Sequence, residues 1–265
     1  MAEVSVLLDA KGEKQRAALA SLWCYASWAV KVYWALSWYE PKYLEHCMIR
    51  HPKNTNLTLH RDVAYQGLAV QVVKGPFISE YLYRLHQTME RALTQYARVF
   101  AFRVDLRLPT GSELPDYAFT NEVIERFIES FKAKIKHNRS QARKLNKYAH
   151  NSKVRYVWAR EFGQHGKPHY HLAILLNRDA FTALGKFEIG RDNMFNRLVE
   201  AWASALRLSV EVMSGLVEIP NNPSYPINRD DPVRQQAFFY RASYLCKSAT
   251  KAYGDGSHGF GCSRG

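Results

Sequence analysis

The pattern of apolar and polar positions predicts four extended segments after residue 75. Large apolar side chains occupy every second position from Phe100 to Leu108, and Pro109 ends this stretch. Residues 154–162 and 168–176 are the second and third strand candidates. The short loop between them contains two glycines, so this pair is expected to form a hairpin. Residues 209–219 are also expected to be extended.

Helices are predicted where apolar residues recur at three- and four-residue spacing. One is expected over residues 76–96, and a second from Thr120, whose side chain is suited to cap a helix N-terminus. A third and a fourth are expected over residues 191–206 and 233–252. The proline-rich segment 220–232 is expected to be a loop.

The order of these elements predicts an α+β fold. From residue 99 onward it is strand, helix, strand, strand, helix, strand, helix, and the first six match the split βαββαβ unit of ferredoxin-like and RRM-like domains. That unit is an antiparallel sheet with helices on one face, which leaves the other face for a ligand and for partial cover by the terminal helix. Residues 76–265 are therefore expected to form one domain. Residues 1–75 are expected to be an extension with a helix over about 13–39 and short extended pieces over 52–73.

The charge balance of the chain indicates a class of binding partner. The chain has 265 residues, of which 47% are hydrophobic, so a folded globular protein is expected and a disordered one is excluded. Its 37 Lys and Arg outnumber 24 Asp and Glu, which favours a polyanion, either nucleic acid or an anionic membrane. Residues 130–160 hold ten Lys or Arg and no acidic residue, which favours phosphate binding over a merely solvated helix face. The candidate DNA-binding residues are Lys132, Lys136, Arg139, Arg143, Lys144 and Lys147.

Two features bear on the compartment. The four cysteines form no C-x-x-C pair, as expected of a reducing cytoplasm. Residues 19–38 are nearly all apolar and long enough to span a membrane, but Lys31 lies among them and no signal-peptide cleavage pattern follows. A buried or interfacial helix is favoured over a membrane anchor, so a cytoplasmic protein is expected.

The first chemical candidate is a metal site built on the hairpin. In a strand, His169 and His171 point to the same face, whereas Tyr170 points to the other. Glu161 lies at the end of the preceding strand, where a hairpin can bring its carboxylate beside the two imidazoles. Two imidazoles and a carboxylate suit Mg²⁺ or Mn²⁺, of which Mn²⁺ tolerates imidazole better. His165 is an alternative third ligand, and Glu161 is otherwise a surface residue at the hairpin end.

The second candidate is a tyrosine nucleophile near the C-terminus. Tyr240 and Tyr244 are four residues apart, so on a helix their hydroxyls share one face, with Lys247 one turn further. A tyrosine hydroxyl has a pKa near 10 and needs a neighbouring cation or metal to react at neutral pH. Lys247 is suited to that role, or to binding a phosphate.

Together these motifs resemble those of the HUH class of rolling-circle replication initiators. The fragment from Gly166 to His171 is similar to the metal motif of that class, and Tyr244-x-x-Lys247 is similar to its nucleophile motif. Within the class, residues 76–265 resemble the inovirus-type and prophage replication proteins of the YagK/YfjJ kind. The pair Tyr240 and Tyr244 resembles the paired tyrosines of some initiators.

The resemblance implies a reaction and its partners. Glu161, His169 and His171 would hold one Mg²⁺ or Mn²⁺, and Tyr244 would attack a phosphate of single-stranded origin DNA. The products would be a 5′-phosphotyrosine and a free 3′-OH for a polymerase of the bacterial host. Tyr240 would be a second nucleophile or a structural residue. The chain has no P-loop, so a host helicase is implied.

Some alternatives stay open at this stage. Asp105 would orient a ligand histidine, or else form a surface charge pair with Arg103. The whole protein could instead be a non-catalytic DNA-binding phage regulator with a structural metal. It could also be a relaxase or transposase of the same class, although relaxases place the tyrosine before the histidine motif.

Overall fold

The structure is a computed structural model, and it describes residues 49–111, 113–163 and 166–265. Four sequence features lie outside the described residues: the helix expected over 13–39, the apolar stretch 19–38, Cys24 with Cys47, and His165. No helix of the described part is long and apolar enough to cross a membrane.

A six-stranded antiparallel sheet forms the centre of the described chain. Every strand pair in it is antiparallel, and the short β9 (Val217–Glu218) pairs with the end of β6 beside β10. In spatial order the other strands are β10 (Ser224–Asn228), β6 (Arg98–Arg107), β8 (Pro168–Asn177), β7 (Arg155–Phe162) and β11 (Phe260–Cys262).

The rest of the described chain forms four α-helices, four 3-10 turns and two small sheets. The α-helices are α2 (Ser79–Gln95), α3 (Glu122–Leu145), α4 (Met194–Leu206) and α5 (Pro232–Ser243). The 3-10 turns are η1 (Val72–Lys74), η2 (Asp116–Phe119), η3 (Val210–Met213) and η4 (Tyr244–Cys246). The small sheets are β1 (Arg50–His51) with β2 (Asn54–His60) and β5 (Phe77–Ile78), and the pair β3 (Ala64–Tyr65) and β4 (Leu68–Ala69).

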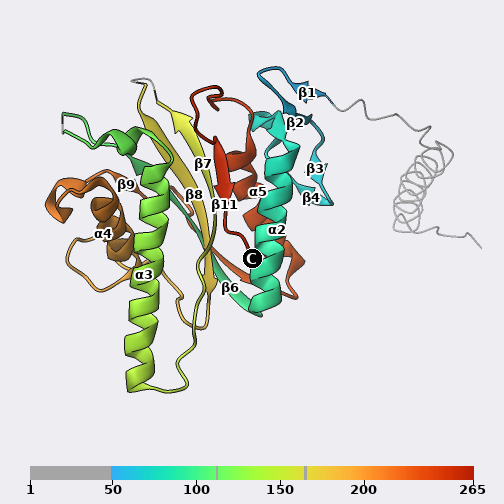
Figure 1. The fold of residues 1–265 in the computed structure, drawn as a ribbon. Helices are drawn as coiled ribbons and strands as arrows, with labels where there is room; N and C mark the ends of the chain where they lie inside the picture. The colour runs from blue at the N-terminus through green and yellow to red at the C-terminus, as the bar shows by residue number, and fades with distance from the viewer. Residues whose placement is uncertain (1–48, 112, 164–165) are drawn as a thin grey trace, which may run out of the picture. The chain divides into compact units, whose positions relative to one another are not determined.

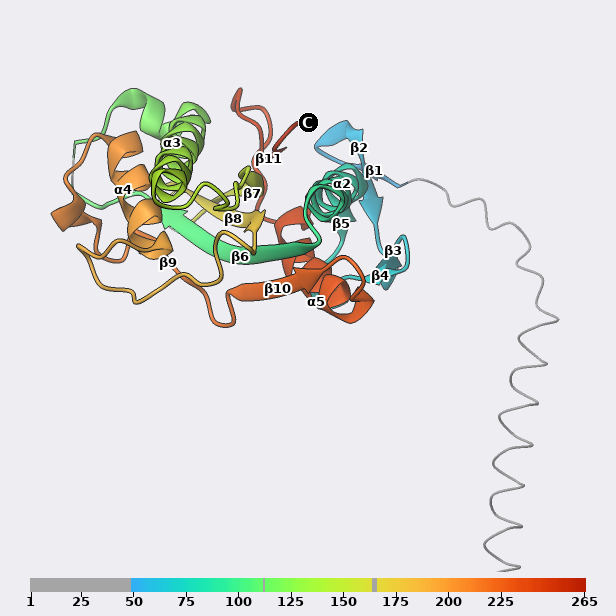
Figure 2. The same ribbon diagram turned by 90° about the horizontal axis from the view of Figure 1, so that it is seen from below.

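Helices cover both faces of the central sheet (Figure 1). Helices α3 and α4 pack on one face and α2 and α5 on the other, as the perpendicular view also shows (Figure 2). The expected cover of the second face by the terminal helix is found in α5, but α2 also packs on that face, which was not predicted. The reason is that the central strands are apolar on both sides: in β8, Leu172 and Ile174 join the core under α3, while Ala173 and Leu175 join the core under α2.

The strand and hairpin predictions in the middle of the chain are confirmed. Strand β6 covers the predicted alternating segment, and β7 and β8 form the predicted hairpin in continuous register from Arg155 to Phe162. Helices α2, α3 and α4 are also found, with α4 starting at Met194 rather than at residue 191. The N-cap of α3 is Asn121 rather than Thr120, although the Thr120 hydroxyl accepts a hydrogen bond from the Glu122 N–H at 3.2 Å.

The last 60 residues depart most from the pattern. Within the segment expected to be a loop, β10 pairs along β6, and its Pro226 is tolerated because β10 is an edge strand. Residues 209–219 are not extended throughout, since η3 interrupts them. The glycine-rich tail contains β11, which was not predicted.

The final helix ends nine residues earlier than the predicted residue 252. It stops at Ser243 and tightens into η4, because Leu245 and Cys246 turn into the core beside α2. The chain then bridges to Phe77 at Lys247, and the Ser248 N–H donates to the Pro76 carbonyl. Tyr244 therefore begins a tight turn and does not sit in the middle of a helix.

A candidate metal and tyrosine site

The histidine and carboxylate positions meet on the sheet face that α2 and α5 cover. Strand register places Glu161 of β7 directly opposite His169 of β8, and Asp105 of β6 directly opposite His171. Side chains of neighbouring opposed positions in an antiparallel sheet lie about 5 Å apart at their Cβ atoms. Polar side chains from three adjacent strands therefore lie close together near one end of the sheet.

The three predicted ligands are brought together. One donor atom each from Glu161, His169 and His171 can be chosen so that all lie within 4.8 Å of one another. Two ligands of one Mg²⁺ ion lie at most about 4.2 Å apart, because each bond is about 2.1 Å long. The donor set and its spacing therefore fit one divalent cation after small side-chain adjustments.

Asp105 lies behind His171, on the side away from Glu161. The Asp105 Oδ1 atom is 2.8 Å from His171 Nδ1, so the two groups form an ion pair when the imidazole is protonated. Arg103 Nη2 donates a hydrogen bond to the same oxygen at 3.0 Å. With Asp105 on Nδ1, His171 presents Nε2 to Glu161, 3.6 Å from Oε2. The alternative of a surface pair between Arg103 and Asp105 does not hold, since both residues are buried.

The two imidazoles have different electrostatic surroundings. Burial and then the neighbouring His171 lower the pKa of His169 to about 4, so His169 is neutral at neutral pH. Burial alone would lower the pKa of His171 too, but the carboxylates of Asp105 and Glu161 outweigh it and raise that pKa. A neutral imidazole is the form that binds a cation, so His169 is ready to act as a ligand at neutral pH.

Glu161 is held by two lysines. The carboxylate is buried, with Lys247 Nζ 3.0 Å from Oε2 and Lys251 Nζ 2.9 Å from Oε1. The Lys251 side chain is 0% exposed, so its ammonium group has no access to water. Burial alone would raise the pKa of Glu161, but contacts with His171 and Lys251 outweigh it and lower the pKa. The carboxylate is thus charged at neutral pH.

Lys251 is a site residue that the sequence patterns did not identify. It lies in the loop after η4, where no helical or strand period assigns a direction to its side chain. Its spacing of four residues from Lys247 resembles a helical pair, but α5 has already ended. A loop lysine becomes visible as a partner of Glu161 only once the path of the chain is known.

Tyr244 and Lys247 are joined directly. Lys247 Nζ donates a hydrogen bond of 2.6 Å to the Tyr244 hydroxyl, and the same ammonium lies 3.9 Å from the centre of the Tyr244 ring. The Tyr244 ring meets the His171 ring edge to face, with centroids 5.5 Å apart. Lys247 therefore links the phenol to the Glu161 carboxylate in a single chain of contacts.

The turn that presents Tyr244 is tied to the segment before η1. The Gln71 N–H donates to the Ser243 hydroxyl at 3.1 Å, and the Gln71 side-chain amide donates to the carbonyls of Tyr240 and Arg241. The orphan carbonyls at the end of α5 are satisfied in this way. Residues of the predicted extension thus fix the position of the tyrosine turn.

Tyr240 is not part of this arrangement. Its side chain is 46% exposed, and no described contact joins its hydroxyl or ring to Glu161, the histidines or Lys247. The backbone remains helical through Ser243 and Tyr244, so Tyr240 lies one helical turn before Tyr244. Tyr244 is thus in contact with the site residues, whereas Tyr240 is exposed.

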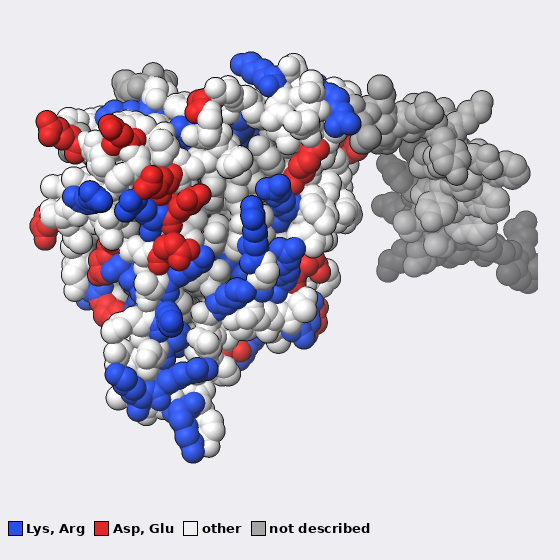
Figure 3. Space-filling view, viewed as in Figure 1, with Lys and Arg blue, Asp and Glu red and all other residues white. Residues whose placement is uncertain are grey.

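The predicted DNA-binding lysines and arginines lie away from the site. They occupy the second half of α3 and the loop after it, whereas α3 packs on the face opposite Glu161 and His169. Figure 3 shows Lys and Arg gathered over the lower end of α3. Lys132 is engaged with Glu129 at 2.8 Å, and the others lack a carboxylate partner among the described residues.

The chain is similar to proteins of one known family. Residues 47–263 match the family described as the YagK/YfjJ C-terminal domain. YfjJ of Escherichia coli strain K12, an uncharacterized protein, is 34% identical over 201 residues, which are 72% of this chain and 97% of that protein. YagK of the same strain, also uncharacterized, is 34% identical over 208 residues, 76% of this chain and 97% of its own length.

One solved structure was also found. It is the catalytic domain of the adeno-associated virus type 5 Rep protein, with 17% identity over 49% of this chain and 69% of that one. The TM-score is 0.20, which is too low to support a conclusion about fold or activity.

Proposed function

The chain belongs to the YagK/YfjJ C-terminal domain family, and from that premise we propose that it is a metal-dependent DNA nicking and joining enzyme of the HUH class. Tyr244 is its nucleophile, and Glu161, His169 and His171 are its metal ligands. Its task is to start rolling-circle replication at a phage or prophage origin in the bacterial cytoplasm.

One observation carries this proposal: the metal-ligand set and the tyrosine share one face of the sheet and are in contact. Tyr244 packs on the ring of His171, and Lys247 joins its hydroxyl to Glu161. The nucleophile and its neighbouring cation thus converge with a ligand cluster from a distant part of the chain. A purely structural ion pair between Lys247 and Glu161 would not require a hydrogen bond from Lys247 to a tyrosine hydroxyl.

The proposed reaction exchanges one phosphate ester for another. The Tyr244 oxygen forms a bond to phosphorus, and the bond between phosphorus and the 3′ oxygen of the preceding nucleotide breaks. The phenolic proton ends on the departing 3′ oxygen, so the products are a 5′-phosphotyrosine and a 3′-OH. The reverse transfer to another 3′-OH rejoins the strand, and because the ester bond energy is retained, no nucleotide cofactor is consumed.

Each residue of the site has a separate role in the proposed reaction. Lys247 stabilises negative charge on the Tyr244 oxygen as its proton departs. Asp105 fixes the His171 ring so that Nε2 faces the ligand cluster. Mg²⁺ or Mn²⁺ held by Glu161, His169 and His171 would supply a Lewis acid for a phosphate oxygen.

The sheet supports the fold expected of this class. In spatial order β10, β6, β8 and β7 run fourth, first, third and second along the chain, all antiparallel. A split βαββαβ unit has this order. We therefore propose that β6 to β10 are that unit, to which α2, α5 and β11 are additions.

The test is covalent capture of single-stranded DNA. Oligonucleotides tiling the genome that encodes the protein are incubated with it in Mn²⁺ or in EDTA, and adducts are resolved on a denaturing gel. We expect an Mn²⁺-dependent adduct that Tyr244→Phe abolishes and that Tyr240→Phe retains for the first cleavage.

Two other outcomes are informative. An adduct that survives Tyr244→Phe would refute Tyr244 as the nucleophile. No adduct on any oligonucleotide, together with tight binding of duplex DNA, would replace the enzyme with a non-catalytic DNA-binding regulator.

A further inference from the structure

Helix α3 continues for ten residues beyond its last buried position. Its buried side chains end at Ile135, and none of residues 136–145 is buried. Figure 1 shows this lower end of α3 projecting past the strands of the sheet. Packing therefore stabilises this end of the helix little, and it does not explain why so many of its exposed side chains are basic.

A cleft of about 440 Å³ lies beside this projection. We call it the basic cleft; the residues that line it are Lys136, Arg139, Ser140, Arg143, Lys144 and Asn151. Four of these are cations and none is acidic. Arg139 is fixed by stacking on the Phe181 ring at 4.4 Å, and Arg143 donates to the Ala149 carbonyl at 3.3 Å.

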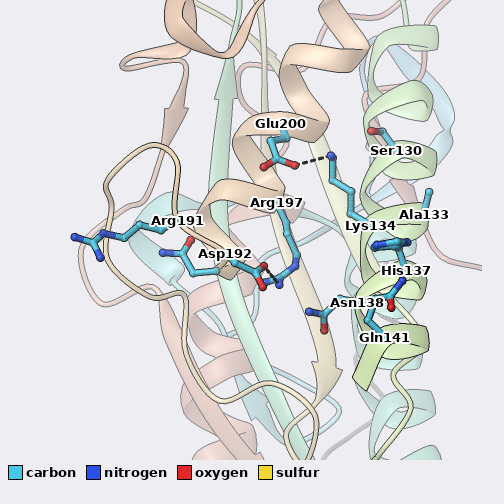
Figure 4. Close-up of a pocket in the computed structure, with 11 residues that line it drawn as sticks. Ser130, Ala133, Lys134, His137, Asn138, Gln141, Arg191, Asp192, Arg197 and Glu200 are labelled. Carbon is cyan, nitrogen blue, oxygen red and sulfur yellow. Dashed lines mark hydrogen bonds and ion pairs between the residues drawn. The ribbon is translucent and has the colours of Figure 1, made fainter. Parts of the chain in front are cut away.

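In a neighbouring cleft on the same helix, carboxylates neutralise two of the basic side chains (Figure 4). This second cleft, of about 610 Å³, lies between α3 and α4 and also contains cations. There Lys134 pairs with Glu200 at 2.6 Å, and Arg197 pairs with Asp192. The basic cleft has no such carboxylates, so its positive charge is available to an external anion.

Helix electrostatics explain only part of the basic cleft. Cations in the last turn of a helix are stabilised by the helix dipole, by about 0.3–1 kcal/mol each, and Arg143 and Lys144 occupy that turn. Lys136 lies more than one turn earlier and Lys147 lies beyond the helix. Tyr148, which the Lys147 ammonium approaches to 5.0 Å, is exposed. The wider basic surface therefore points to a ligand.

The basic cleft lies at the end of the sheet opposite the tyrosine site. Residues 150–153 follow the α3 end and contact Asn177 at the end of β8, whereas His169 is at its start. Val99 pairs with Asn177 and Arg107 with His169, eight residues apart along β6. At about 3.3 Å per residue this is roughly 26 Å, comparable to about eight base pairs of duplex at 3.4 Å each.

We propose that the basic cleft at the α3 end is a second DNA site, which binds the phosphate backbone of double-stranded DNA independently of the tyrosine site. A row of cations on a projecting helix fits phosphates at regular spacing, and four of the six residues that line the cleft are cations. Contacts of this kind with the phosphate backbone carry no sequence information, and they hold duplex DNA about eight base pairs from the cleavage point. The location relative to cleavage rests on the proposed function, but the duplex binding does not.

The test uses the full chain and a 20-base-pair duplex of arbitrary sequence in EDTA. The triple variant Lys136→Gln, Arg143→Gln, Lys144→Gln is compared with a control that removes three exposed cations elsewhere, Lys53→Gln, Lys186→Gln and Arg234→Gln. Each phosphate contact contributes about 0.9 to the slope of log affinity against log salt. We expect the α3 variant to lose about 2.7 of that slope and at least about tenfold in affinity at 0.1 M salt, and the control to lose much less.

Adduct formation on a single-stranded oligonucleotide separates this inference from the proposed function. Retained adduct with lost duplex binding supports two sites. Equal loss of duplex binding in the α3 variant and the control would overturn the basic cleft as a specific site, as would unchanged binding in the α3 variant. If no adduct forms with the unaltered protein, the proposed function fails while the duplex result still decides the basic cleft.

Discussion

At the scale of residues, the site combines positions that periodicity can assign with others that it cannot. His169 and His171 share a face because strand side chains alternate, and Glu161 joins them because the hairpin loop is short enough to fix the register. The Lys251 ammonium reaches Glu161 from an irregular loop, so no pattern in the sequence reveals it. Strand geometry therefore predicted that the three ligand residues lie together. The buried Lys251, which balances the charge of Glu161, can be identified only once the path of the chain is known.

Removing the Lys251 charge should destabilise the protein. Lys251→Met leaves Glu161 buried with one lysine partner fewer, and breaking a buried ion pair costs about 3–5 kcal/mol. We expect a fall of about 3 kcal/mol in the free energy of unfolding, measured by urea denaturation. The exposed Lys186→Met is the matched control and should change stability by less than about 0.5 kcal/mol. An unaltered urea midpoint for Lys251→Met would show that the ion pair contributes nothing.

Stability should fall with acidification in a window set by His169. Its pKa is about 4 in the folded protein against an ordinary value of 6.5, so the unfolded chain binds the proton more tightly and low pH favours unfolding. The lowered pKa values of Glu161 and Asp105 act in the same direction as the pH falls through and below their ordinary range. The raised pKa of His171 acts oppositely, since its contribution is lost as the pH rises above 6.5.

The check is the urea midpoint at pH 6.5 and at pH 4.5, in EDTA. We expect His169→Gln to lose less stability between these two pH values than the unaltered protein does. Substitution of the exposed His150 by Gln should leave the difference unchanged. The same pH difference in His169→Gln and in the unaltered protein would contradict the assignment.

Lys247 should matter for rate. In Lys247→Gln, the ammonium that contacts the Tyr244 oxygen at 2.6 Å is lost, and removing one such electrostatic contact from an active site costs about 10²–10³-fold. We expect adduct formation to slow by about 10²-fold in single-turnover assays, with partial recovery in Lys247→Arg. Far-UV circular dichroism verifies that both variants are folded. A rate within threefold of the original in Lys247→Gln would remove Lys247 from the reaction.

At the scale of elements, the strongly periodic segments were predicted and the edges of the sheet were not. Strands β6, β7 and β8 are central and apolar, so their patterns are clear. The edge strands β10 and β11 are short and contain Pro226 or Gly261, residues that usually mark loops. Their pairing is determined by the neighbouring strand, and the sequence of an edge strand alone does not contain that information.

Gly261 should be intolerant of any side chain. A Cβ atom at this position in β11 would lie 2.5 Å from the ring of Trp158 in β7, which is buried in the core. Gly261→Ala should lower the free energy of unfolding by about 1–3 kcal/mol, as overpacked positions do. Thermal and urea denaturation measure the change, with Gly163→Ala as control because its nearest neighbour would be 3.9 Å away. Equal stability of the two variants would mean that β11 is not packed as described.

At the scale of the whole molecule, the candidate tyrosine site and the basic cleft lie at opposite ends of one sheet. The tyrosine site lies between the sheet and the α2 and α5 layer, and the basic cleft lies on the far end of α3. The net positive charge of the sequence predicted a polyanion, but charge alone did not tell which end of the fold would bind it. In the proposed function, this separation lets one end hold duplex DNA while the other acts on a single strand.

The central claim is that Tyr244 becomes covalently linked to DNA. The most direct measurement digests the Mn²⁺-dependent adduct with nuclease and protease and identifies the nucleotide-bearing peptide by mass spectrometry. We predict a nucleotide 5′-phosphate on Tyr244 in the unaltered protein. A nucleotide attached to any other residue, such as Tyr240 or Tyr253, would contradict the account.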